Sequence, residues 1–435
     1  VCGEVWMEPG LTAEETLRTQ ACIYQDKNHA GKVVLVLGAG NASTLLATDL
    51  LYKLFVEDQV VAFKCNPVNT YLGPLIEEGF RALVRRGFLR VIYGGGEIGA
   101  YLCHHPAVDE LHLTGSDKTF EAIVFGRGAE GAKRKARRDP MITKRFTAEL
   151  GNISPVIIVP GPWNDEEVKE QAAQLATMLT ANAGFNCMTP RVIIQHKNWD
   201  QREALVKAIG EVLSDVETRK AYYPGAKERY EAFITAHPDA LQFGSASGDH
   251  LPWTLIADVT PDNPDDICFQ TEAFCGLFAE TALEAPGVSE FIDGAVEFAN
   301  KTLWGTLAAT IIVHPGSLDD PQVAAAVDRA IAGLSYGTVG VNLFPAYGYY
   351  FMLTPWGGFP GHDMYDVQSG IGVTNNVLMF ARPQKSVWRG PFRKSPDPLT
   401  VTSKRAHEFC KKLAYFEASP SAWKLPGMIW TATWS

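Results

Sequence analysis

The feature that most constrains the fold is a regular alternation of short apolar runs with longer amphipathic stretches in the first part of the chain. Residues 32–37 (KVVLVL) predict a buried strand, and residues 43–55 predict a helix after it. The same order repeats, with strands expected at 59–63, 89–93 and 110–114 and helices at 72–86 and 98–104. Strand–helix–strand order at this spacing is typical of right-handed βαβ units in a parallel sheet.

A second alternating series begins after residue 150. Strands are expected at 154–159, 191–195, 253–258, 276–280, 308–314 and 339–343, and helices at 165–182, 200–213, 288–300 and 318–334. Past Asn376 the pattern weakens into aromatic and proline-containing sequence, so we expect irregular structure there. A length of 435 residues agrees with two or three domains. We therefore predict an α/β protein with two sequential domains and an irregular C-terminal segment.

Charge and hydropathy exclude several classes of protein. The chain has 39 Lys and Arg against 49 Asp and Glu, a net charge of −10, which argues against a general nucleic-acid binder. Its one dense basic run, residues 133–138, falls in a Gly/Lys/Arg-rich break at 127–140 and predicts a solvated loop. No uninterrupted apolar run of about 18 residues exists, so no membrane span is expected. Because it starts at Val1 without Met, we expect the chain to begin part-way into a longer product.

The cysteines indicate a reducing environment. Eight are scattered through the chain, with no CxxC pair and no His/Cys cluster at metal-ligand spacing. The pattern favours reduced thiols over a disulfide framework or a zinc site. We therefore expect a cytoplasmic protein with no metal.

A glycine-containing turn follows the first expected strand. Residues 38–43 (GAGNAS) form G-x-G-x-x-S, one residue short of the dinucleotide-binding fingerprint, in the expected place between strand and helix. No Asp or Glu closes the second strand, which runs into Lys64 and Pro67. A tight strand-to-helix turn with Asn41 near the helix start explains the segment equally well.

Three further residues could carry chemistry, and each has an ordinary structural explanation. Cys187 ends an apolar helix, where a buried structural cysteine is common. The Asn and Gly before it would nevertheless suit a nucleophile beside an oxyanion hole. Glu149 and Glu272 each lie in a short polar segment where a surface or capping carboxylate is usual.

The order of these elements is more informative than any one of them. Over roughly residues 30–372 the chain resembles the aldehyde dehydrogenase superfamily. Asn182, Gly184 and Cys187 match the nucleophile element Asn-x-Gly-x-x-Cys in full. The other elements that resemble the family are Gly40-Asn41, Lys64, Thr114-Gly115-Ser116, residues 149–155 (ELGNISP), 272–276 (EAFCG), 337–342 (GTVGVN) and 355–359 (PWGGF).

The resemblance implies a fold and a division into domains. Residues 1–150 would form a Rossmann-type parallel-sheet domain for the cofactor, N-terminally incomplete and with an insertion near 117–148. Residues 151–345 would form the α/β catalytic domain. Residues 346–435 would supply the substrate tunnel, an oligomerisation segment and an extended tail. The aromatic run at 347–352 would make the tunnel suit an apolar or aromatic aldehyde.

The resemblance also implies roles for individual residues. Cys187 would attack the aldehyde, Asn41 would stabilise the oxyanion, and Glu149 would activate water to hydrolyse the thioester to a carboxylic acid. The cofactor-binding residues would be Lys64, Gly115, Ser116, Glu272 and Phe274. The cofactor would be NAD or NADP, because Pro67 stands where the family commonly has a ribose-binding Glu.

The positions where the chain differs from the family's usual motifs leave other functions open. Residues 63–67 (FKCNP) are similar to the Phe-Ser-Pro-His-Pro of CoA-acylating members, so an acyl-CoA-forming enzyme is the second hypothesis. A catalytically silent scaffold member is the third. We expect a small aldehyde as partner, no nucleic acid, and a homodimer or homotetramer. The apolar run Val377–Phe380 would be an exposed strand edge in a monomer.

Overall fold

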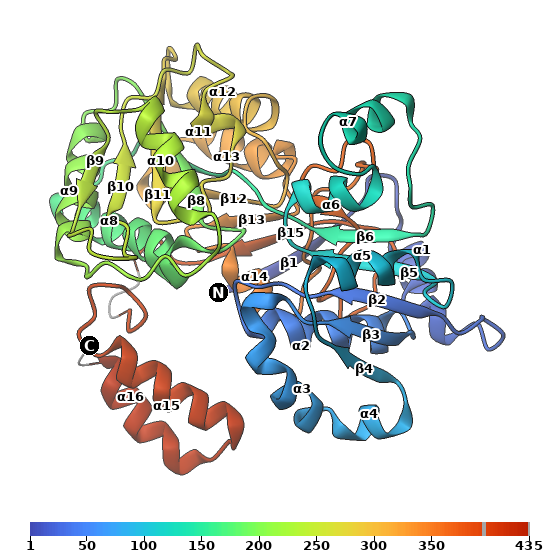
Figure 1. Cartoon of the computed structure of the whole chain (residues 1–435). Helices are drawn as coiled ribbons and strands as arrows, with labels where there is room; N and C mark the ends of the chain where they lie inside the picture. Colours follow the sequence, from blue (N-terminus) through green and yellow to red (C-terminus); the bar gives the residue numbers. More distant parts are fainter. Residues whose placement is uncertain (394–396, 434–435) are drawn as a thin grey trace.

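Two sheets lying side by side organise the molecule (Figure 1). The computed structural model describes residues 1–393 and 397–433. Within these residues a six-stranded sheet has the order β14-β6-β5-β2-β3-β4, and a nine-stranded sheet has the order β1-β15-β13-β12-β7-β8-β11-β10-β9. Both are mostly parallel, so the predicted α/β class is confirmed.

The six-stranded sheet contains the expected βαβ series. Its strands are β2 (Val33–Leu37), β3 (Val60–Lys64), β4 (Leu89–Ile92), β5 (Glu110–Thr114), β6 (Phe146–Glu149) and β14 (Gly370–Ile371). Its helical segments are α2 (Thr44–Leu51), η2 (Tyr52–Val56), η3 (Pro67–Leu72), α3 (Gly73–Gly79), α4 (Arg81–Arg86), α5 (Gly96–His104), α6 (Asp117–Val124) and α7 (Gly128–Arg137). The chain runs outward from β2 to β3 and β4, then returns to place β5 on the other side of β2. The strand order therefore reverses between β2 and β5. Open α/β sheets bind ligands at the carboxyl ends of the strands beside such a topological switch point.

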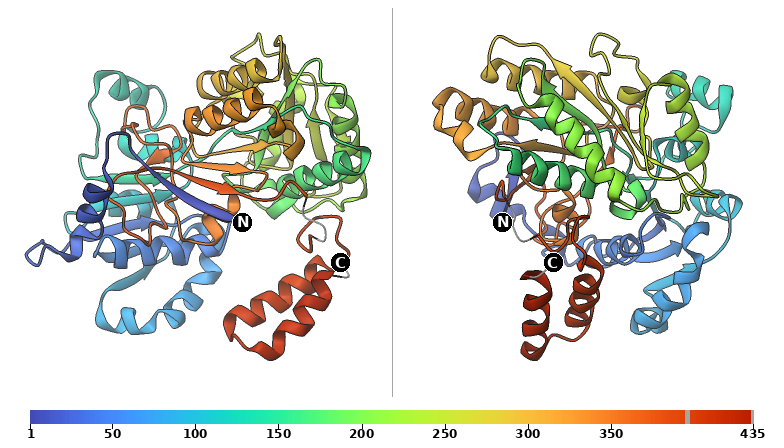
Figure 2. Two further views of the ribbon diagram at one scale, coloured as in Figure 1. Left: turned by 180° about the vertical axis from the view of Figure 1, so that it is seen from behind. Right: turned by 90° about the vertical axis from the view of Figure 1, so that its left-hand side faces the viewer.

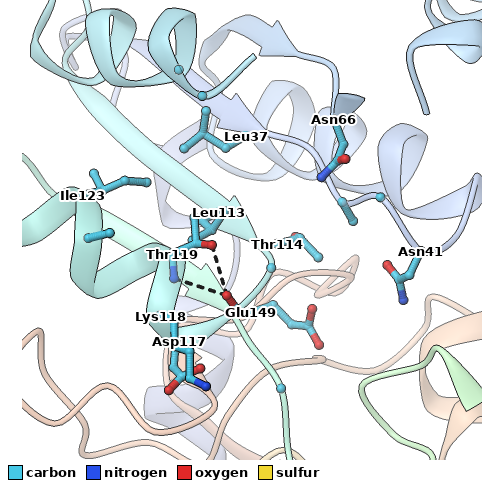
Figure 3. A pocket seen from close by; sticks show the side chains of 18 of the residues that line it. Leu37, Asn41, Asn66, Leu113, Thr114, Asp117, Lys118, Thr119, Ile123 and Glu149 are labelled. Carbon is cyan, nitrogen blue, oxygen red and sulfur yellow. Dashed lines mark hydrogen bonds between the residues drawn. The ribbon is translucent and has the colours of Figure 1, made fainter. Parts of the chain in front are cut away.

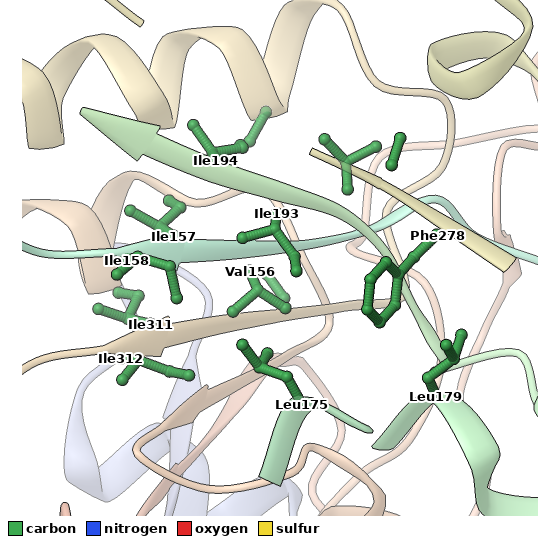
Figure 4. Close-up of a cluster of buried hydrophobic side chains, with 14 of the residues drawn as sticks. Val156, Ile157, Ile158, Leu175, Leu179, Ile193, Ile194, Phe278, Ile311 and Ile312 are labelled. Atoms are coloured by element: carbon green, nitrogen blue, oxygen red, sulfur yellow. The ribbon is translucent and has the colours of Figure 1, made fainter. Parts of the chain in front are cut away.

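The nine-stranded sheet carries the larger hydrophobic core. Its strands are β1 (Cys2–Met7), β7 (Ser154–Ile158), β8 (Pro190–His196), β9 (Leu241–Phe243), β10 (Trp253–Ile256), β11 (Leu277–Leu283), β12 (Ala308–Ile312), β13 (Thr338–Val341) and β15 (Pro383–Arg389). Its main helices are α8 (Asp165–Thr180), α9 (Arg202–Asp215), α10 (Ala226–Ala236), α11 (Ile267–Gln270), α12 (Val288–Lys301), α13 (Pro321–Gly333) and α14 (Ala346–Tyr350). Ile311, Ile157 and Ile193 lie on the adjacent strands β12, β7 and β8 and are fully buried in this core (Figure 4). Helices cover both faces, which explains the continuous apolar runs of its central strands.

The two sheets divide the chain between Glu149, the last residue of β6, and Ser154, the first of β7. Two segments cross this division. β1 pairs antiparallel with β15 in the nine-stranded sheet, and β14 pairs antiparallel with β6 in the other.

Two regions expected to be irregular are in fact regular. Residues 127–140 were expected to be a loop, but they contain α7, which includes most of the basic run. Its Ala, Glu, Lys and Arg residues favour a helix, and cations in the last turn complement the helix dipole. Beyond Asn376 the chain forms β15 and then a hairpin of α15 (Ala406–Ala418) and α16 (Leu425–Thr433) that projects from the body (Figures 1 and 2).

The expectation of a strand edge at Val377–Phe380 was wrong. This segment is a turn closed by Asn376, whose Oδ1 accepts a hydrogen bond from the Phe380 N–H at 3.1 Å. Met379 has a left-handed φ of 55°, which no strand accommodates. Val377 and Leu378 are nevertheless exposed. Among residues 1–393 and 397–433, no helix is long and apolar enough to cross a membrane.

Candidate active site

A cavity of about 850 Å³ opens where the six-stranded sheet faces the loops of the nine-stranded sheet (Figure 3). Every residue that the sequence analysis proposed for catalysis or cofactor binding lines it. These are Asn41, Lys64, Gly115, Ser116, Glu149, Cys187, Glu272 and Phe274. They come from six separate loops or strand ends, so the fold brings together residues as far as 233 positions apart (Asn41 to Phe274).

Parallel pairing explains why four of these loops meet. Leu37 at the end of β2 is level with Lys64 on β3 and with Leu113 on β5, and Thr114 is level with Glu149 on β6. The carboxyl ends of parallel strands lie on one edge of a sheet, so the loops after them converge. The cavity therefore sits at the switch point between β2 and β5.

A left-handed turn presents Cys187 to the cavity. Asn182, Ala183 and Gly184 in η4 (Ala181–Gly184) have φ values of 50°, 55° and 78°. A Cβ at position 184 would overlap the Cys275 carbonyl, so both conformation and space require glycine there. The buried Arg191 holds the two segments together by donating to the Gly184 carbonyl at 2.7 Å and the Cys275 carbonyl at 2.6 Å.

Asn41 is fixed beside the Cys187 turn. Its Nδ2 donates to the Phe185 carbonyl at 2.9 Å. Its own carbonyl accepts from Asn182 Nδ2 at 2.8 Å and from the Tyr222 hydroxyl at 2.6 Å. The second N–H of the Asn41 amide has no partner in the described part of the chain, so a donor is left for a ligand in the cavity.

Glu149 lies next to the Cys187 thiol, within hydrogen-bonding reach of it, and accepts a hydrogen bond from Trp356 Nε1 at 3.3 Å. Burial raises the pKa of Glu149 to about 8, because an ionised carboxylate is poorly solvated there, and the nearby charge of Asp49 raises it further. The hydrogen bonds with Cys187 and Trp356 act in the opposite direction. At neutral pH the carboxyl is therefore mostly protonated.

Burial also raises the pKa of the Cys187 thiol well above its usual value, and the Glu149 carboxylate adds to this effect. The thiol is only 8% exposed, as the structural explanation of this cysteine expects. It nevertheless forms part of the cavity wall, as the nucleophile hypothesis requires.

Glu272 and Phe274 lie in a loop that is anchored from two sides. Glu272 Oε1 accepts from the Asn152 N–H at 3.2 Å, and a Cβ on Gly151 would overlap its carboxylate. Burial raises the pKa of Glu272 to about 7, against the lowering effect of Arg191 and Arg229. Arg229 on α10 also donates to the carbonyls of Ala273 at 3.1 Å and Phe274 at 3.3 Å.

The opposite end of the cavity is polar but poorly paired. Lys64 is 6% exposed, and its ammonium has no hydrogen-bond or ion-pair partner among the residues that the structure describes. Burial lowers its pKa. Ser116 caps α6, with its Oγ accepting from the Thr119 N–H at 3.2 Å. A buried cation without a partner fits a ligand that supplies hydroxyl or phosphate oxygens.

The aromatic run at 347–352 is divided in the structure. Tyr349 is buried in the same apolar cluster as Cys187, and its ring packs edge-on against Trp356 at 5.6 Å between centroids. Tyr350, Phe351 and Met352 are exposed instead. Only one residue of the run therefore contacts the surroundings of Cys187 in this cluster.

Two tyrosines that the sequence did not point to contact the residues of the site and hold them in place. Tyr222 reaches Asn41 and Asn182, and its ring packs against Phe185 at 4.9 Å. Tyr223 packs against Phe274 at 5.0 Å. Both precede Pro224 in a segment without periodicity, so no sequence signal identified them.

The chain belongs to the aldehyde dehydrogenase family, whose model matches residues 33–374. It is 25% identical over 349 residues to a putative aldehyde dehydrogenase of Gibberella fujikuroi, covering 78% of this chain and 66% of the relative. It is 30% identical over 154 residues to 4-trimethylaminobutyraldehyde dehydrogenase A of Danio rerio, covering 35% of this chain and 26% of the relative. The chain thus matches between about a quarter and two thirds of the length of these relatives.

Solved structures share the fold at low sequence identity. A gamma-glutamyl-gamma-aminobutyraldehyde dehydrogenase from Burkholderia cenocepacia superposes with a TM-score of 0.62 at 22% identity, covering 82% of this chain and 67% of the other. An NADP-dependent glyceraldehyde-3-phosphate dehydrogenase from Bacillus halodurans, complexed with NADP, gives 0.61 at 20% identity, covering 82% and 68%. An indole-3-acetaldehyde dehydrogenase complexed with NAD+ gives 0.58 at 18% identity, covering 82% and 67%.

Proposed function

We propose that this chain oxidises an aldehyde to a carboxylic acid with NAD or NADP, using Cys187 as nucleophile and Glu149 as general base. The observation that carries the proposal is that the reactive groups share one cavity. The thiol of Cys187, the free amide donor of Asn41 and the carboxyl group of Glu149 line this cavity. The cavity extends to the switch point between β2 and β5, where several glycines form its wall. The family membership makes this reaction class the natural one.

The first half of the reaction uses Cys187 and Asn41. The Cys187 thiol gives its proton to water, the thiolate adds to the aldehyde carbon and forms a thiohemiacetal, and the carbonyl oxygen gains negative charge. The free N–H of Asn41 and the backbone N–H of Cys187 are the donors proposed for that oxygen. Removing one such donor typically costs about 3–4 kcal/mol of transition-state stabilisation.

The chain's own residues fit a dinucleotide in the remainder of the cavity. Lys64 would bind ribose hydroxyls, Gly115 and Ser116 would lie against the pyrophosphate at the start of α6, and Glu272 and Phe274 would hold the nicotinamide ribose. A bound NAD or NADP would accept the hydride that the thiohemiacetal carbon loses as the Cys187 thioester forms. Pro67 in place of an acidic residue leaves the 2′ position of the adenosine ribose without carboxylate repulsion, which supports use of both cofactors.

The second half of the reaction depends on Glu149. Its carboxylate takes a proton from water, and the resulting hydroxide attacks the Cys187 thioester to release the acid. Trp356 holds the carboxyl through Nε1, which keeps it aimed at the sulfur. A carboxyl with a pKa of about 8 is basic enough to remove this proton at mildly alkaline pH.

An apolar or aromatic aldehyde is the substrate class that the surroundings of Cys187 support. Met188, Tyr349 and Trp356 belong to the buried cluster that contains the nucleophile. Apolar surface removed from water contributes roughly 25 cal/mol per Å².

The test is a panel of apolar, aromatic and charged aldehydes assayed with NAD and NADP, with and without CoA. We expect formation of the free acid, with turnover highest for the apolar or aromatic members. Cys187→Ser should be inactive, whereas Cys65→Ser, the same change at a buried cysteine outside the cavity, should remain active. Acyl-CoA as the main product would favour the CoA-acylating alternative, and no turnover with any aldehyde would favour the scaffold alternative.

A further inference from the structure

Three metal-ligating side chains meet at the junction of α10 and α11, outside the cavity. His237 ends α10, and Asp266 and Cys268 begin α11. His237 Nε2 lies 3.0 Å from Asp266 Oδ1 and 3.5 Å from Cys268 Sγ, and the three ligand atoms lie within 4.8 Å of one another. Among residues 1–393 and 397–433, no other group of three His, Cys, Asp or Glu side chains converges in this way.

We propose that His237, Asp266 and Cys268 bind one divalent zinc ion, with water as the fourth ligand. An imidazole nitrogen, a carboxylate oxygen and a thiolate are the three donor types that Zn²⁺ takes in proteins. The ion would be structural, because it would lie behind the loop that lines the cavity and not in the cavity itself.

The separations match a coordination shell. Around a tetrahedral Zn²⁺ with bonds of about 2.0–2.3 Å, neighbouring ligand atoms are about 3.3–3.7 Å apart. The observed N···O and N···S separations of 3.0 and 3.5 Å are close to these values. A zinc ion could therefore enter with shifts of only a few tenths of an ångström in these two separations.

Hydrogen bonding alone accounts less well for this arrangement. His237 Nε2 faces both Asp266 Oδ1 and Cys268 Sγ, but an imidazole nitrogen carries only one hydrogen or one lone pair. It can pair with only one of them, so hydrogen bonding alone requires the Cys268 thiol to pair with the Asp266 carboxylate and leaves the approach of His237 Nε2 to the sulfur unexplained. An ion at the centre would bond to all three atoms at once.

Exposure leaves room for the fourth ligand. Cys268 is buried, whereas the side chains of His237 and Asp266 are 20% and 12% exposed. Water can therefore approach from the side of the imidazole and carboxylate. The two negative ligands, a carboxylate and a thiolate, would balance the charge of the ion, which limits the cost of burying it.

The position of the site suggests what the ion would do. α10 carries Arg229, which holds the carbonyls of Ala273 and Phe274. α11 runs directly into Thr271 and Glu272, which line the cavity. An ion that joins the end of α10 to the start of α11 would fix both supports of the Glu272–Phe274 loop.

The simplest competing explanation is a capped helix. Asp266 Oδ1 accepts from the Cys268 N–H at 2.9 Å and so caps α11, and His237 would merely be a further partner. Asp266→Asn separates the two explanations, because Asn caps a helix about as well as Asp but loses the carboxylate charge. Cys268→Ser is the matching change at the sulfur, and Cys410→Ser is a control at an exposed cysteine on α15.

The experiment titrates the chelator-treated full chain with Co²⁺ as a spectroscopic probe and with Zn²⁺ in thermal melts. We expect one Co²⁺ per chain with a sulfur-to-cobalt charge-transfer band and tetrahedral d–d bands, all displaced by Zn²⁺. Cys268→Ser should lose the charge-transfer band and Cys410→Ser should keep it. Zn²⁺ should raise the melting temperature of the wild type but not that of Asp266→Asn.

Two spectroscopic results would overturn the proposal. One is the absence of the charge-transfer band in the wild type at saturating Co²⁺, and the other is its survival in Cys268→Ser. A fold lost in Cys268→Ser would not obscure the answer, because Asp266→Asn tests the same site without changing the sulfur. A zinc-induced rise in melting temperature that persists unchanged in Asp266→Asn would also overturn the proposal, because zinc would then bind without the Asp266 carboxylate, and the absence of any zinc-induced rise in the wild type would favour helix capping.

Discussion

The pH dependence of thioester hydrolysis is the sharpest consequence of the buried carboxyl beside Cys187. In the proposed mechanism Glu149 works as a base only when ionised, and burial raises its pKa to about 8. Hydrolysis should therefore be slow at low pH and should increase as pH rises through about 8. The hydrolysis rate rises with pH because only the ionised carboxylate can accept a proton from water.

The size of the effect follows from the same pKa. With a pKa of about 8, about 9% of Glu149 is ionised at pH 7 and about 91% at pH 9, a tenfold difference. Asp49 contributes to the raised pKa through its charge, and it accepts a hydrogen bond from Thr114 Oγ1 at 2.7 Å. Asp49→Asn keeps an acceptor for Thr114 but removes the charge. This variant should therefore shift the profile to lower pH.

The assay must separate the two half-reactions, because the Cys187 thiol also has a raised pKa. Stopped-flow measurement of reduced cofactor gives a burst for thioester formation and a slower steady phase for hydrolysis. The steady phase should rise with a midpoint near pH 8. Glu149→Gln should retain a burst, since hydride transfer does not need the carboxylate, and should then turn over very slowly with no such midpoint.

Two outcomes would refute the reasoning. A steady phase that is constant between pH 6 and pH 9 in an enzyme limited by hydrolysis would show that no base of this pKa is involved. An unchanged steady rate in Glu149→Gln, with acyl-CoA as product when CoA is added, would remove Glu149 from the role and support the CoA-acylating alternative.

Three further predictions are independent of this profile. Cys187→Ser should abolish oxidation while leaving cofactor binding measurable by fluorescence titration, and surviving turnover would exclude Cys187. NADP should be used within about tenfold of the NAD rate, because Pro67 leaves the 2′ position free of a carboxylate, and strict NAD dependence in a steady-state comparison would contradict this. Gly151→Ala should disturb Glu272, since the added Cβ would overlap its carboxylate, and should weaken cofactor binding in the same titration; unchanged affinity would mean that Glu272 does not hold the cofactor.

The oligomeric state remains a prediction of its own. The turn at Val377 and Leu378 exposes apolar side chains, as do Trp423 and Ile429 on the C-terminal hairpin. Exposed apolar groups of this size are typical of association surfaces. We expect a dimer or tetramer in light scattering at micromolar concentration, and a monodisperse monomer would contradict it.

Local sequence pattern determined the larger part of the fold. The strands β2, β3, β4 and β5 lie within a residue or two of their expected positions, because a buried parallel strand needs a short apolar run bounded by turn residues. The break of the expected 72–86 helix at Phe80 and the helix α7 were missed. α3 and α4 are only 7 and 6 residues long, which is too short for a helical period to mark their ends, and α7 is dominated by Gly, Lys and Arg, a composition that is also typical of loops.

The candidate site was also visible in part. The order of motifs pointed to eight residues that line the cavity, since each motif keeps its own local turn chemistry. Their supports were not visible, because Arg191 and Tyr222 act through partners that are distant in the sequence or lie in another loop. The same reason hid β1, which becomes a strand only because β15 offers it an edge nearly 400 residues later.

The sequence by itself therefore determined the family, the parallel sheets and eight of the residues that line the cavity, because these follow from local patterns and motif order. Only the tertiary structure decided how the parts meet. It buried Glu149 beside Cys187, and this burial raises the pKa of the carboxyl group. It also brought His237 next to Asp266, 29 residues later in the sequence, and to Cys268. Burial, electric field and ligand convergence are properties of distances in space, and no local spacing along the chain encodes them.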